Sequence, residues 1–456
     1  MSSTITESAR AIPVIHEADI CVLGGSCTGL FAALRAARRG ARVVIVEKDN
    51  CFGGIATTAM VNVWHSLWNT TGDRQIIGGL TEEVIGRLEK RNAVERREKT
   101  NPSIGFTFNS EELKIELDEL AREAGIKVYF HTFFTAPLLN EGRLEAVAVE
   151  NKSGRGAIRA RYFIDATGDG DLAERLGCPT YFANHLQPAT ACARFAGWDT
   201  LGSHNYQNLL REHGEEFNFP KGFAWGCRVP DSDIYMLAAT RIYGINPSNA
   251  DDLTWGEIEG RRQIRAIQDL LRAHAPGSHL TLQALPSRLG LRESRHVRGQ
   301  YQLTGDDVLH GRRFEDAIAQ GSYRVDIHHQ DKPGITLQYL DGSQTYQVPG
   351  FPTEHARWRP ETATNPTFYQ VPYRCLLPQG GFANVIVAGR MLDMDPVAHA
   401  AVRVMVNLNQ TGEAAGVAAT LALASGVGFA DVPVKAIQAA LVEGGSICPA
   451  GLEDVR

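Results

Sequence analysis

The chain has 456 residues and a formal charge of −6, from 46 Lys and Arg against 52 Asp and Glu. Its 43% hydrophobic and 21% charged residues exclude a disordered chain, a collagen-like fibre and a coiled coil, and the length is typical of two or three domains. The mildly acidic balance argues against nucleic acid or an anionic membrane as the main partner. Residues 1–18 lack the apolar core of a signal peptide, no apolar run is as long as a membrane span, and the eight cysteines form no CxxC pair. These features predict a cytoplasmic enzyme with free thiols.

The segment 19–47 has the pattern of a dinucleotide-binding turn. A buried strand at 19–23 is followed by a glycine-rich turn, a helix at 30–39 and a second strand at 41–46 that ends in Glu47. Gly24 allows the tight turn, Gly29 lets the helix pack closely, and the N–H groups at the helix start bind a pyrophosphate. Glu47 can accept hydrogen bonds from a ribose diol, while Ser26 replaces the middle glycine and offers a hydroxyl. The expected pyrophosphate contacts are Gly24, Gly25, Ser26, Cys27, Thr28 and Gly29.

Three separate strand ends carry glycine, which predicts a ligand longer than a nicotinamide dinucleotide. Beyond the first turn, a Gly-Gly-x-x-Thr segment at 53–57 suits a chain that passes beside an extended cofactor. A strand at 162–164 leads into residues 165–171, and a strand at 384–388 ends at Gly389 and Arg390. A ligand that touches all three is FAD rather than NAD. The spacing after Gly168 does not form a second complete glycine fingerprint, which argues against a dedicated NAD(P)H domain.

Six motifs run in order from about residue 18 to about residue 425: GGSCTGL, EKDNCFGGIATTAMVNVWH, IDATGDGDLAERLG, LGLRESRHVRGQYQLTGDDVLHGRRFEDAIAQGSYRVDIH, VPYRCLLP and VIVAGRMLDMDPVAHAAVRVMVNLNQTGEAAGVAA. Together they resemble the FAD-dependent oxidoreductases of the glutathione-reductase-like superfamily. Within it they are similar to the branch with precorrin-3B-synthase-like and heterodisulfide-reductase-subunit-A-like flavoproteins. The resemblance implies an α/β fold with a Rossmann-like FAD-binding domain, made of a parallel sheet and a β-meander, and a second α+β substrate domain. It also implies FAD contacts at Glu47, Lys48, Gly53, Gly54, Thr57, Ala166, Thr167, Gly168, Asp169, Gly389 and Arg390.

The last long helix is expected at 405–423, with a face of small residues that allows close packing on the sheet: Gly412, Ala414, Ala415, Gly416, Ala418 and Ala419. The resemblance implies that the N-terminus of this helix points at the flavin pyrimidine, where a positive helix end stabilises negative charge. Arg403 would add a full positive charge there. The alternative role for Arg403 is a surface salt bridge.

We expect the FAD-binding domain to be discontinuous. It comprises residues 1–63, 110–176, 284–320 and 371–456, and a substrate domain comprises 64–109, 177–283 and 321–370. Capping boxes predict helices that begin near Asn109 and near Thr254, where Glu257 completes the box. Strands at 144–149 and 157–164 form the meander.

The catalytic candidates are groups that can remove a proton beside the flavin. His65 follows the Gly-Gly-x-x-Thr segment, and its alternative is a packed structural histidine. Asp326 and His328 are two residues apart and would share a face on a strand, where the carboxylate orients the imidazole. The alternative for this pair is a salt bridge at a domain junction. His399 is a weaker candidate base.

Two further groups have open interpretations. Arg292 and Arg295 either clamp a substrate carboxylate or belong to a motif that joins the domains through Glu293. Cys27 and Cys51 lie near the expected cofactor path, and small buried thiols are a simpler interpretation than a covalent flavin link or a redox disulfide. No metal site is predicted, because the adjacent His328 and His329 lack further ligands at suitable spacing.

The sequence therefore predicts an FAD-dependent dehydrogenase or oxidase. The enzyme would move a hydride from a C–H bond of a small polar organic substrate to flavin N5 and pass the electrons to O2 or another carrier. The alternatives are a flavin monooxygenase that uses NAD(P)H and O2, and a protein whose FAD is structural or sensory. No nucleic acid and no membrane is expected as a partner, and a homo-oligomer is compatible with the sequence.

Overall fold

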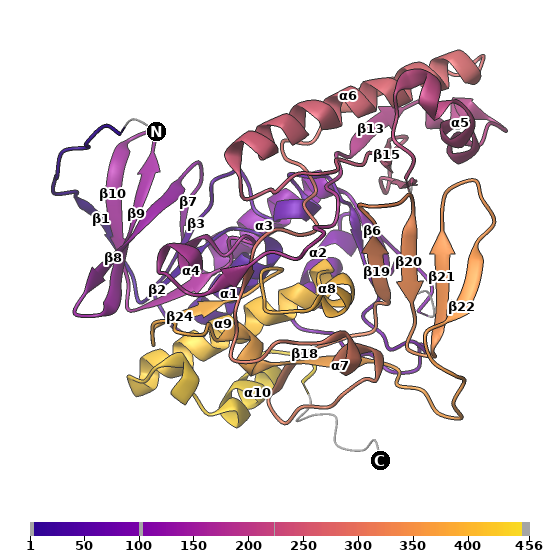
Figure 1. Cartoon of the computed structure of the whole chain (residues 1–456). Coiled ribbons are helices and arrows are strands. Elements are labelled where there is room, and N and C mark those ends of the chain that lie inside the picture. Colours follow the sequence, from indigo (N-terminus) through magenta and orange to yellow (C-terminus); the bar gives the residue numbers. More distant parts are fainter. Residues whose placement is uncertain (1–3, 100–103, 223, 449–456) are drawn as a thin grey trace.

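The computed structural model describes residues 4–99, 104–222 and 224–448, and its centre is a parallel sheet (Figure 1). The sheet has five strands in the order β24-β11-β2-β3-β7, and every neighbouring pair in it is parallel. The strands are β2 (Ile20–Leu23), β3 (Val43–Val46), β7 (Lys127–Tyr129), β11 (Tyr162–Asp165) and β24 (Val385–Val387). All except β7 are buried along their whole length, as expected for short apolar runs covered on both faces. The predicted α/β fold is confirmed.

Helices α1 (Cys27–Arg38) and α9 (Met405–Ser425) pack against each other beside this sheet. A Cβ at Gly412 would lie 2.0 Å from the carbonyl oxygen of Thr28, and one at Gly416 would lie 2.2 Å from that of Ala32. The small residues of α9 therefore allow close packing, as predicted. Gly412 and Gly416 approach α1, and α9 also contacts β11 of the sheet, so α1 is a packing partner in addition to the expected one.

A second sheet forms the predicted meander. It has the order β1-β10-β9-β8, and only the pair β1 and β10 is parallel. The expected single strand at 157–164 is wrong, because the chain leaves this sheet after Arg159 and enters the parallel sheet at Tyr162. The strands are β1 (Val14–Glu17), β8 (Phe133–Asn140), β9 (Arg143–Asn151) and β10 (Gly154–Arg159).

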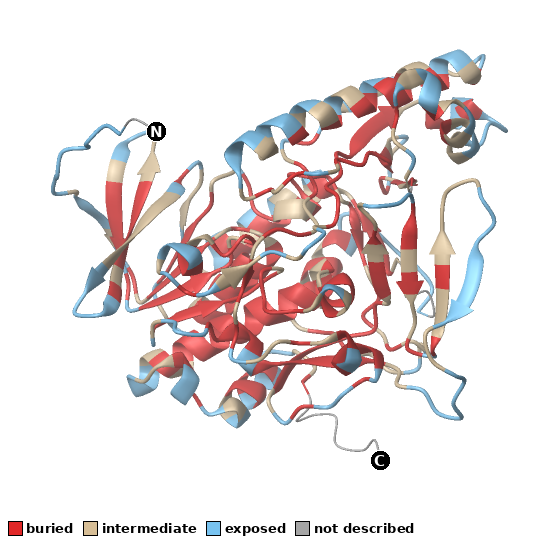
Figure 2. Cartoon of the chain, viewed as in Figure 1, coloured by how far each residue is buried: buried red, intermediate tan, exposed pale blue. Residues whose placement is uncertain are grey.

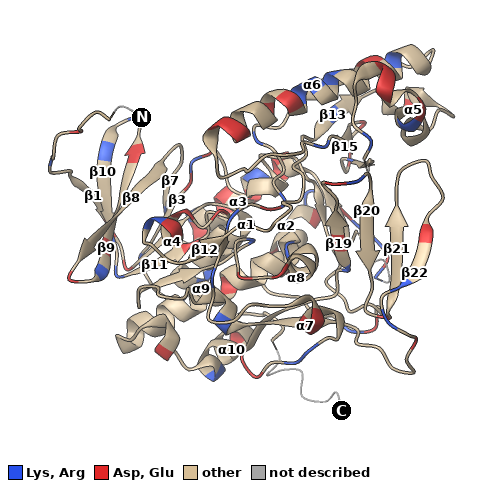
Figure 3. Ribbon diagram, viewed as in Figure 1, with Lys and Arg blue, Asp and Glu red and all other residues tan. Residues whose placement is uncertain are grey.

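A third, antiparallel sheet, β14-β15-β13-β16, lies beneath the long helix α6 (Figure 1). Its side chains and those of α6 form a hydrophobic core of their own, which includes Phe195, Ile267 and Leu271. Helix α6 carries both acidic and basic residues (Figure 3), which form i,i+3 and i,i+4 ion pairs. The elements are β13 (Ala193–Ala196), η2 (Trp198–Leu201), α5 (Tyr206–His213), η3 (Gly214–Phe217), β14 (Trp225–Arg228), β15 (Tyr235–Ala238), α6 (Ala250–His274) and β16 (Thr281–Ala284).

Helix α6 begins five residues earlier than predicted. Asn249 is its N-cap, and the Asn249 side chain accepts hydrogen bonds from the N–H groups of Asp251 and Asp252. The Thr254 hydroxyl instead donates to the carbonyl of Ala250 within the helix. The prediction of a helix start near Asn109 is confirmed, since Asn109 caps α3 (Ser110–Glu123).

The remaining elements surround the parallel sheet and α9. A four-stranded sheet, β19-β20-β21-β22, forms one side of the molecule (Figure 1). The small sheets are β4-β6-β5, β18-β23 and β12-β17. The bounds are η1 (Gly54–Ala56), β4 (Val63–Trp64), α2 (Leu80–Glu89), β5 (Val94–Arg96), β6 (Phe106–Phe108), α4 (Asp171–Arg175), β12 (Thr180–Tyr181), β17 (His296–Val297), α7 (Gly305–Leu309), β18 (Ala317–Gly321), β19 (Val325–His328), β20 (Ile335–Gln338), β21 (Ser343–Gln347), β22 (Glu354–Arg357), β23 (Tyr369–Pro372), η4 (Tyr373–Leu376), α8 (Pro396–Val402), η5 (Phe429–Asp431) and α10 (Val434–Glu443).

The largest hydrophobic core joins segments that are far apart in the sequence (Figure 2). Trp64, Ile76 and Leu80 pack in the same cluster as Leu30 and Val417. The division of the chain into an FAD-binding and a substrate domain stays a prediction. Among the described residues, every helix is too short or too polar to cross a membrane.

Candidate active site

A cavity of about 1160 Å³ opens where the strand ends of the parallel sheet meet α1, α6, α9 and β19. Its size exceeds that of most small-molecule pockets, so it has room for an extended cofactor and a substrate. The residues predicted to hold FAD that line it are Gly24, Ser26, Cys27, Thr28, Glu47, Lys48, Gly53, Gly54, Ala166, Thr167, Gly168, Asp169, Gly389, Arg390 and Arg403. The other three of that set, Gly25, Gly29 and Thr57, are not part of its lining.

The glycine turn between β2 and α1 has the geometry that its sequence predicts. Gly24 has a φ of +99°, and a Cβ there would lie 2.3 Å from the carbonyl oxygen of Ala166. A Cβ at Gly29 would lie 1.9 Å from the Gly24 carbonyl oxygen. Ser26 is the N-cap of α1, and its Oγ accepts a hydrogen bond from the N–H of Gly29 at 3.4 Å. The substituted serine therefore stabilises the helix start that faces the cavity.

Glu47 directly follows β3 and is a buried carboxylate in the cavity wall. Its Oε1 accepts a hydrogen bond from the N–H of Asp49 at 2.8 Å, and its Oε2 accepts one from the N–H of Gly25. Burial, reinforced by the nearby Asp49 carboxylate, raises the pKa of Glu47. Glu47 thus connects the glycine turn to the end of β3, in addition to any contact with a ribose.

The Gly53–Gly54 turn lies directly against the first glycine turn. The N–H of Gly53 donates to the Gly25 carbonyl at 2.9 Å, and a Cβ at Gly54 would lie 2.9 Å from the Cβ of Ser26. Thr57 donates its hydroxyl to the carbonyl of Phe52 at 2.6 Å. Thr57 therefore stabilises the turn from outside the cavity.

Arg390 and Asp169 form an ion pair between two strand ends. Nη2 of Arg390 lies 2.5 Å from Oδ1 of Asp169, which also accepts a hydrogen bond from the hydroxyl of Ser294. Burial opposes ionisation of Asp169, but Arg390 and Lys48 hold its pKa below the usual range. A Cβ at Gly168 would lie 2.3 Å from Nη1 of Arg390, so this glycine makes room for the guanidinium.

Asp326 is the centre of a hydrogen-bonded group at the other end of the cavity. Its Oδ2 accepts hydrogen bonds from the Tyr323 hydroxyl at 2.8 Å and from Nη2 of Arg403 at 3.1 Å. The Nε2 of His328 lies 3.3 Å from the same oxygen. Arg403 follows α8 and precedes α9, and its side chain is 11% exposed. It is therefore a buried ion-pair partner in the cavity wall, which excludes the surface salt bridge.

His328 is a neutral imidazole in this group. Burial and the nearby Arg292 lower its pKa well below the usual range. Burial opposes ionisation of Asp326, but contacts with His328, Arg403 and Arg324 outweigh it and hold the Asp326 pKa well below its usual range. A carboxylate can only accept, so Nε2 of His328 carries the ring proton and Nδ1 keeps its lone pair. Nδ1 has no hydrogen-bond partner among the described residues.

His65 lines the cavity, and its Nδ1 is buried without a hydrogen-bond partner among the described residues. Its ring centroid lies 4.1 Å from that of Tyr323. Burial and the Arg324 cation lower the pKa of His65 to about 3. The structure therefore brings His65, Asp326 and His328 to one end of the cavity.

The two arginines of the Arg-Glu-Ser-Arg motif are separated by the fold. Arg292 lines the cavity, and its Nη1 donates to the carbonyl of Pro188 at 2.6 Å. Arg295 lies outside the lining, and its Nη1 donates to the Asp169 carbonyl at 3.1 Å. A clamp that uses both arginines is therefore excluded. Glu293 accepts a hydrogen bond from the N–H of Gln187 at 2.9 Å, which joins the motif to the segment before β13.

His399 does not line the cavity. It is fully buried in α8, beside Glu293 and His296, and neither ring nitrogen has a hydrogen-bond partner among the described residues. Burial lowers its pKa to about 3. Cys27 is a buried thiol at the cavity, and burial raises its pKa to about 12. Cys51 is buried as well.

Sequence reasoning missed three contributors to this site. Tyr323 was not singled out, although a buried tyrosine needs a partner for its hydroxyl and Asp326 follows three residues later. Ser294 lies inside the Arg-Glu-Ser-Arg motif, where the charged residues give the stronger signal. Arg241 is buried near Arg292 and comes from a segment with no recognisable motif.

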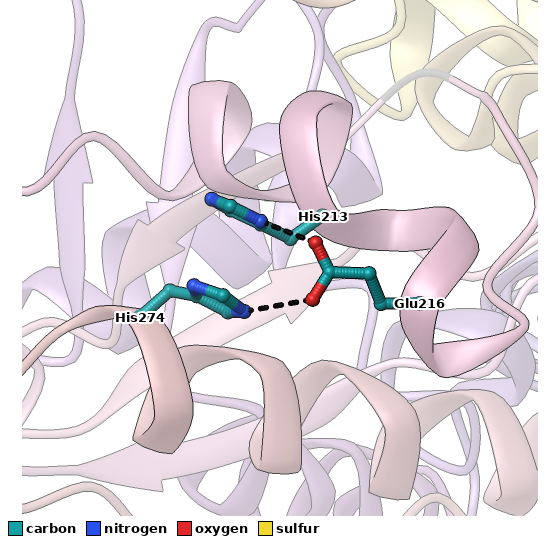
Figure 4. A group of neighbouring side chains, drawn as sticks. All are labelled: His213, Glu216 and His274. Atoms are coloured by element: carbon teal, nitrogen blue, oxygen red, sulfur yellow. Dashed lines mark hydrogen bonds and ion pairs between the residues drawn. The ribbon is translucent and has the colours of Figure 1, made fainter.

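A separate group of possible ligands lies away from the cavity (Figure 4). The rings of His213 and His274 are stacked 3.5 Å apart, and Glu216 contacts both. Its carboxylate lies 2.7 Å from Nδ1 of His213 and 3.3 Å from Nε2 of His274. These contacts join the ends of α5 and α6. The absence of a metal site stays a prediction.

Residues 19–441 match a family model described as FAD dependent oxidoreductase. The chain is 26% identical over 216 residues to digeranylgeranylglycerophospholipid reductase 1 of Methanopyrus kandleri, over 46% of this chain and 54% of that protein. It is 24% identical over 160 residues to thiamine thiazole synthase of Methanococcus vannielii, over 33% of this chain and 56% of that protein. The chain thus spans about half the length of the curated relatives it matches.

Two solved structures cover most of the chain at low identity. A geranylgeranyl bacteriochlorophyll reductase-like protein of Thermoplasma acidophilum has a TM-score of 0.47 and 14% identity, over 94% of this chain and 83% of that one. The p-nitrophenol 4-monooxygenase of Pseudomonas putida has a TM-score of 0.46 and 12% identity, over 94% and 85%.

The cofactor is FAD, and the residues of the cavity fit it. Gly24, Gly53 and Gly54 line the cavity, and each packs so closely on a neighbouring segment that an added Cβ would lie 2.9 Å or less from it. Nε of Arg390 and Oδ1 of Asn409 are buried without partners among the described residues, and both residues line the cavity. The glycine turn, Glu47 and Arg390 would hold the dinucleotide, and the start of α9 lies at the same cavity.

Proposed function

The chain belongs to the FAD dependent oxidoreductase family, and from this premise we propose that it is a dehydrogenase or oxidase of a small polar organic molecule. When bound, FAD accepts the hydrogen and the electron pair of the broken C–H bond. The electrons then pass to O2 or another carrier. The resemblance to the branch with precorrin-3B-synthase-like and heterodisulfide-reductase-subunit-A-like flavoproteins remains part of this proposal. It does not identify the substrate.

The observation that carries the proposal is the contact between Asp326 and His328 in the cavity wall. Asp326 accepts a hydrogen bond from the Nε2–H of His328 at 3.3 Å, which leaves Nδ1 as the acceptor for a second proton. A base in this state can remove the proton of a substrate O–H or N–H while the adjacent C–H bond breaks. Tyr323 and Arg403 hold the Asp326 carboxylate in place and so act as positioning residues.

The relatives that are named reductases raise the opposite direction as a second candidate. Reduction of a substrate double bond needs a proton donor beside the cofactor. Burial and Arg292 lower the pKa of His328 well below its usual range, so the ring is unprotonated at neutral pH. An unprotonated His328 favours oxidation of the substrate. The experiment also tests the reductive direction.

The test begins with the visible spectrum of the purified protein before and after acid precipitation, which shows whether FAD is bound and whether it is released. Anaerobic mixing with a panel of alcohols, hydroxy acids and amines then identifies compounds that bleach the flavin. We expect His328→Asn to keep its FAD and to slow bleaching by about 10²–10⁴-fold, the usual contribution of a general base.

His65→Asn provides the comparison at the same end of the cavity. If both variants bleach the flavin as fast as the unchanged protein does, neither His328 nor His65 is the base. Oxidation of the reduced flavin by an unsaturated compound, with no bleaching by any donor, would support the reductase direction instead. Consumption of NADPH with an oxygenated product would identify a monooxygenase.

A further inference from the structure

Arg292 is a cavity-lining cation that has no acidic partner within the described part of the chain. Among the residues that the structure describes, no carboxylate oxygen lies within 4.0 Å of its guanidinium. Its side-chain hydrogen bond is to the carbonyl of Pro188, at 2.6 Å. Other arginines of the same cavity are paired, Arg288 with Asp49 at 2.6 Å and Arg390 with Asp169 at 2.5 Å.

A second unneutralised arginine increases the positive charge at this end. Arg241 is 2% exposed, and its Nη1 donates a hydrogen bond to the carbonyl of the preceding residue, Thr240, at 2.7 Å. Nη2 of Arg241 has no hydrogen-bond partner among the described residues. Burial and the cations Arg241 and Arg403 lower the pKa of Arg292 to about 9. The single carboxylate of this group, Asp326, already pairs with Arg403.

Arg292 is half-buried, and a partly desolvated cation that lacks a counter-ion is stabilised by a ligand that supplies the negative charge. A guanidinium presents paired donors that match the two oxygens of a carboxylate. Arg292 and His328 line the same cavity, and the charge of Arg292 helps to lower the pKa of His328.

We propose that Arg292 binds the carboxylate of the substrate, so that the enzyme oxidises a hydroxy acid or an amino acid. This inference rests on the proposed dehydrogenase or oxidase function. The O–H or N–H proton moves to Nδ1 of His328, the C–H hydrogen leaves with its electron pair to FAD, and a C=O or C=N bond forms. The acid group stays intact and fixes the orientation of the reacting carbon.

The test measures binding without turnover. The FAD-loaded protein is titrated with acetate, propionate and benzoate, and with the matching amides, and the change in flavin absorption gives Kd. We expect the carboxylates to bind about ten- to a hundredfold more tightly than the amides, because a charged hydrogen-bonded pair is lost in the amide. Arg292→Gln removes this preference, and Arg292→Lys keeps part of it.

Arg261→Gln is the control, because Arg261 is another cavity-lining cation but has Glu257 as its partner at 3.3 Å. It should keep the preference for carboxylates. Equal affinities for acids and amides in the unchanged protein would overturn the inference, as would tighter binding of inorganic phosphate. Carboxylate binding that depends on Arg292, with no acid or amine able to bleach the flavin, would instead overturn the proposed oxidation and leave the anion site standing.

Discussion

Gly412 of α9 faces the carbonyl oxygen of Thr28 in α1 so closely that a Cβ would lie 2.0 Å from it. Thr28 is at once a helix residue and part of the cavity lining. The contact therefore sets the position of the turn that holds FAD. The helix pair is a support for the cofactor site as well as a part of the core.

Replacement of Gly412 by alanine should force α1 and α9 apart. We expect Gly412→Ala to lower the free energy of unfolding by about 1–3 kcal/mol, the usual cost of overpacking, and to weaken FAD binding. Urea unfolding and flavin fluorescence measure the two effects. Gly86→Ala is the control, because Gly86 lies in α2 with nothing within 4 Å of an added Cβ, and should gain about 0.5–1 kcal/mol. Equal effects at both positions would contradict the role of the close contact.

The buried ion pair between Arg35 and Glu413 should be required for stability. Glu413 also accepts hydrogen bonds from Ser446 at 2.9 Å and from the N–H of Leu80 at 3.3 Å. Glu413→Gln leaves Arg35 buried without its counter-ion, and we expect a loss of about 3–5 kcal/mol in urea unfolding. Glu83→Gln breaks the more exposed pair with Arg38 and should cost at most about 1 kcal/mol. Similar losses in both variants would contradict this prediction.

Asp326→Asn should impair catalysis while FAD stays bound. The amide can donate a proton to His328, which favours the wrong tautomer, and we expect a fall in kcat of up to about 10⁴-fold with little change in KM. Asp331 is the exposed ion-pair partner of the neighbouring His329, and Asp331→Asn should leave kcat unchanged. Stopped-flow reduction of the flavin measures both. A kcat within threefold of the original protein would show that Asp326 does not position the base.

Acid should destabilise the protein through its buried histidines. Burial lowers the pKa of His65 and of His399 to about 3, and that of His328 well below its usual range. Between these values and the unfolded pKa near 6.5, the unfolded chain binds more protons, so stability falls as the pH falls. Each histidine contributes up to about 1.4 kcal/mol per pH unit. Tm measured from pH 7.5 to pH 5.5 should show the loss.

His399→Gln should flatten this pH dependence, because it removes one of the three groups without touching the cavity. His355→Gln, at an exposed position on β22, should leave the slope as it is. If both variants have the slope of the original protein, the protons taken up on unfolding come from other groups.

The cofactor half of the site was predictable because its signals are local. The turn at Gly24, the acid at Glu47 and the strand ends at Asp165 and Gly389 lie within a few residues of the strands that position them. The Asp326 and His328 pair was predictable for the same reason, since a strand places residues i and i+2 on one face.

The errors concern contacts between distant segments. The size of the residues on α9 predicts a close approach but not its additional partner α1, which lies almost 400 residues earlier. His399 precedes the last helix as expected, yet α8 turns it toward Glu293 and His296 instead of the cavity. At α6, two capping patterns compete, and Asn249 supplies the cap instead of Thr254.

The order of strands in the parallel sheet has a consequence for synthesis on the ribosome. Strands β2 and β3 and helix α1 emerge early, but β24 and α9, which complete the sheet and cover α1, emerge about 350 residues later. A nascent chain therefore exposes the apolar face of α1 for most of its translation, a state in which chains are prone to aggregate. Cofactor capture belongs to the end of this process, when the final strand closes the cavity.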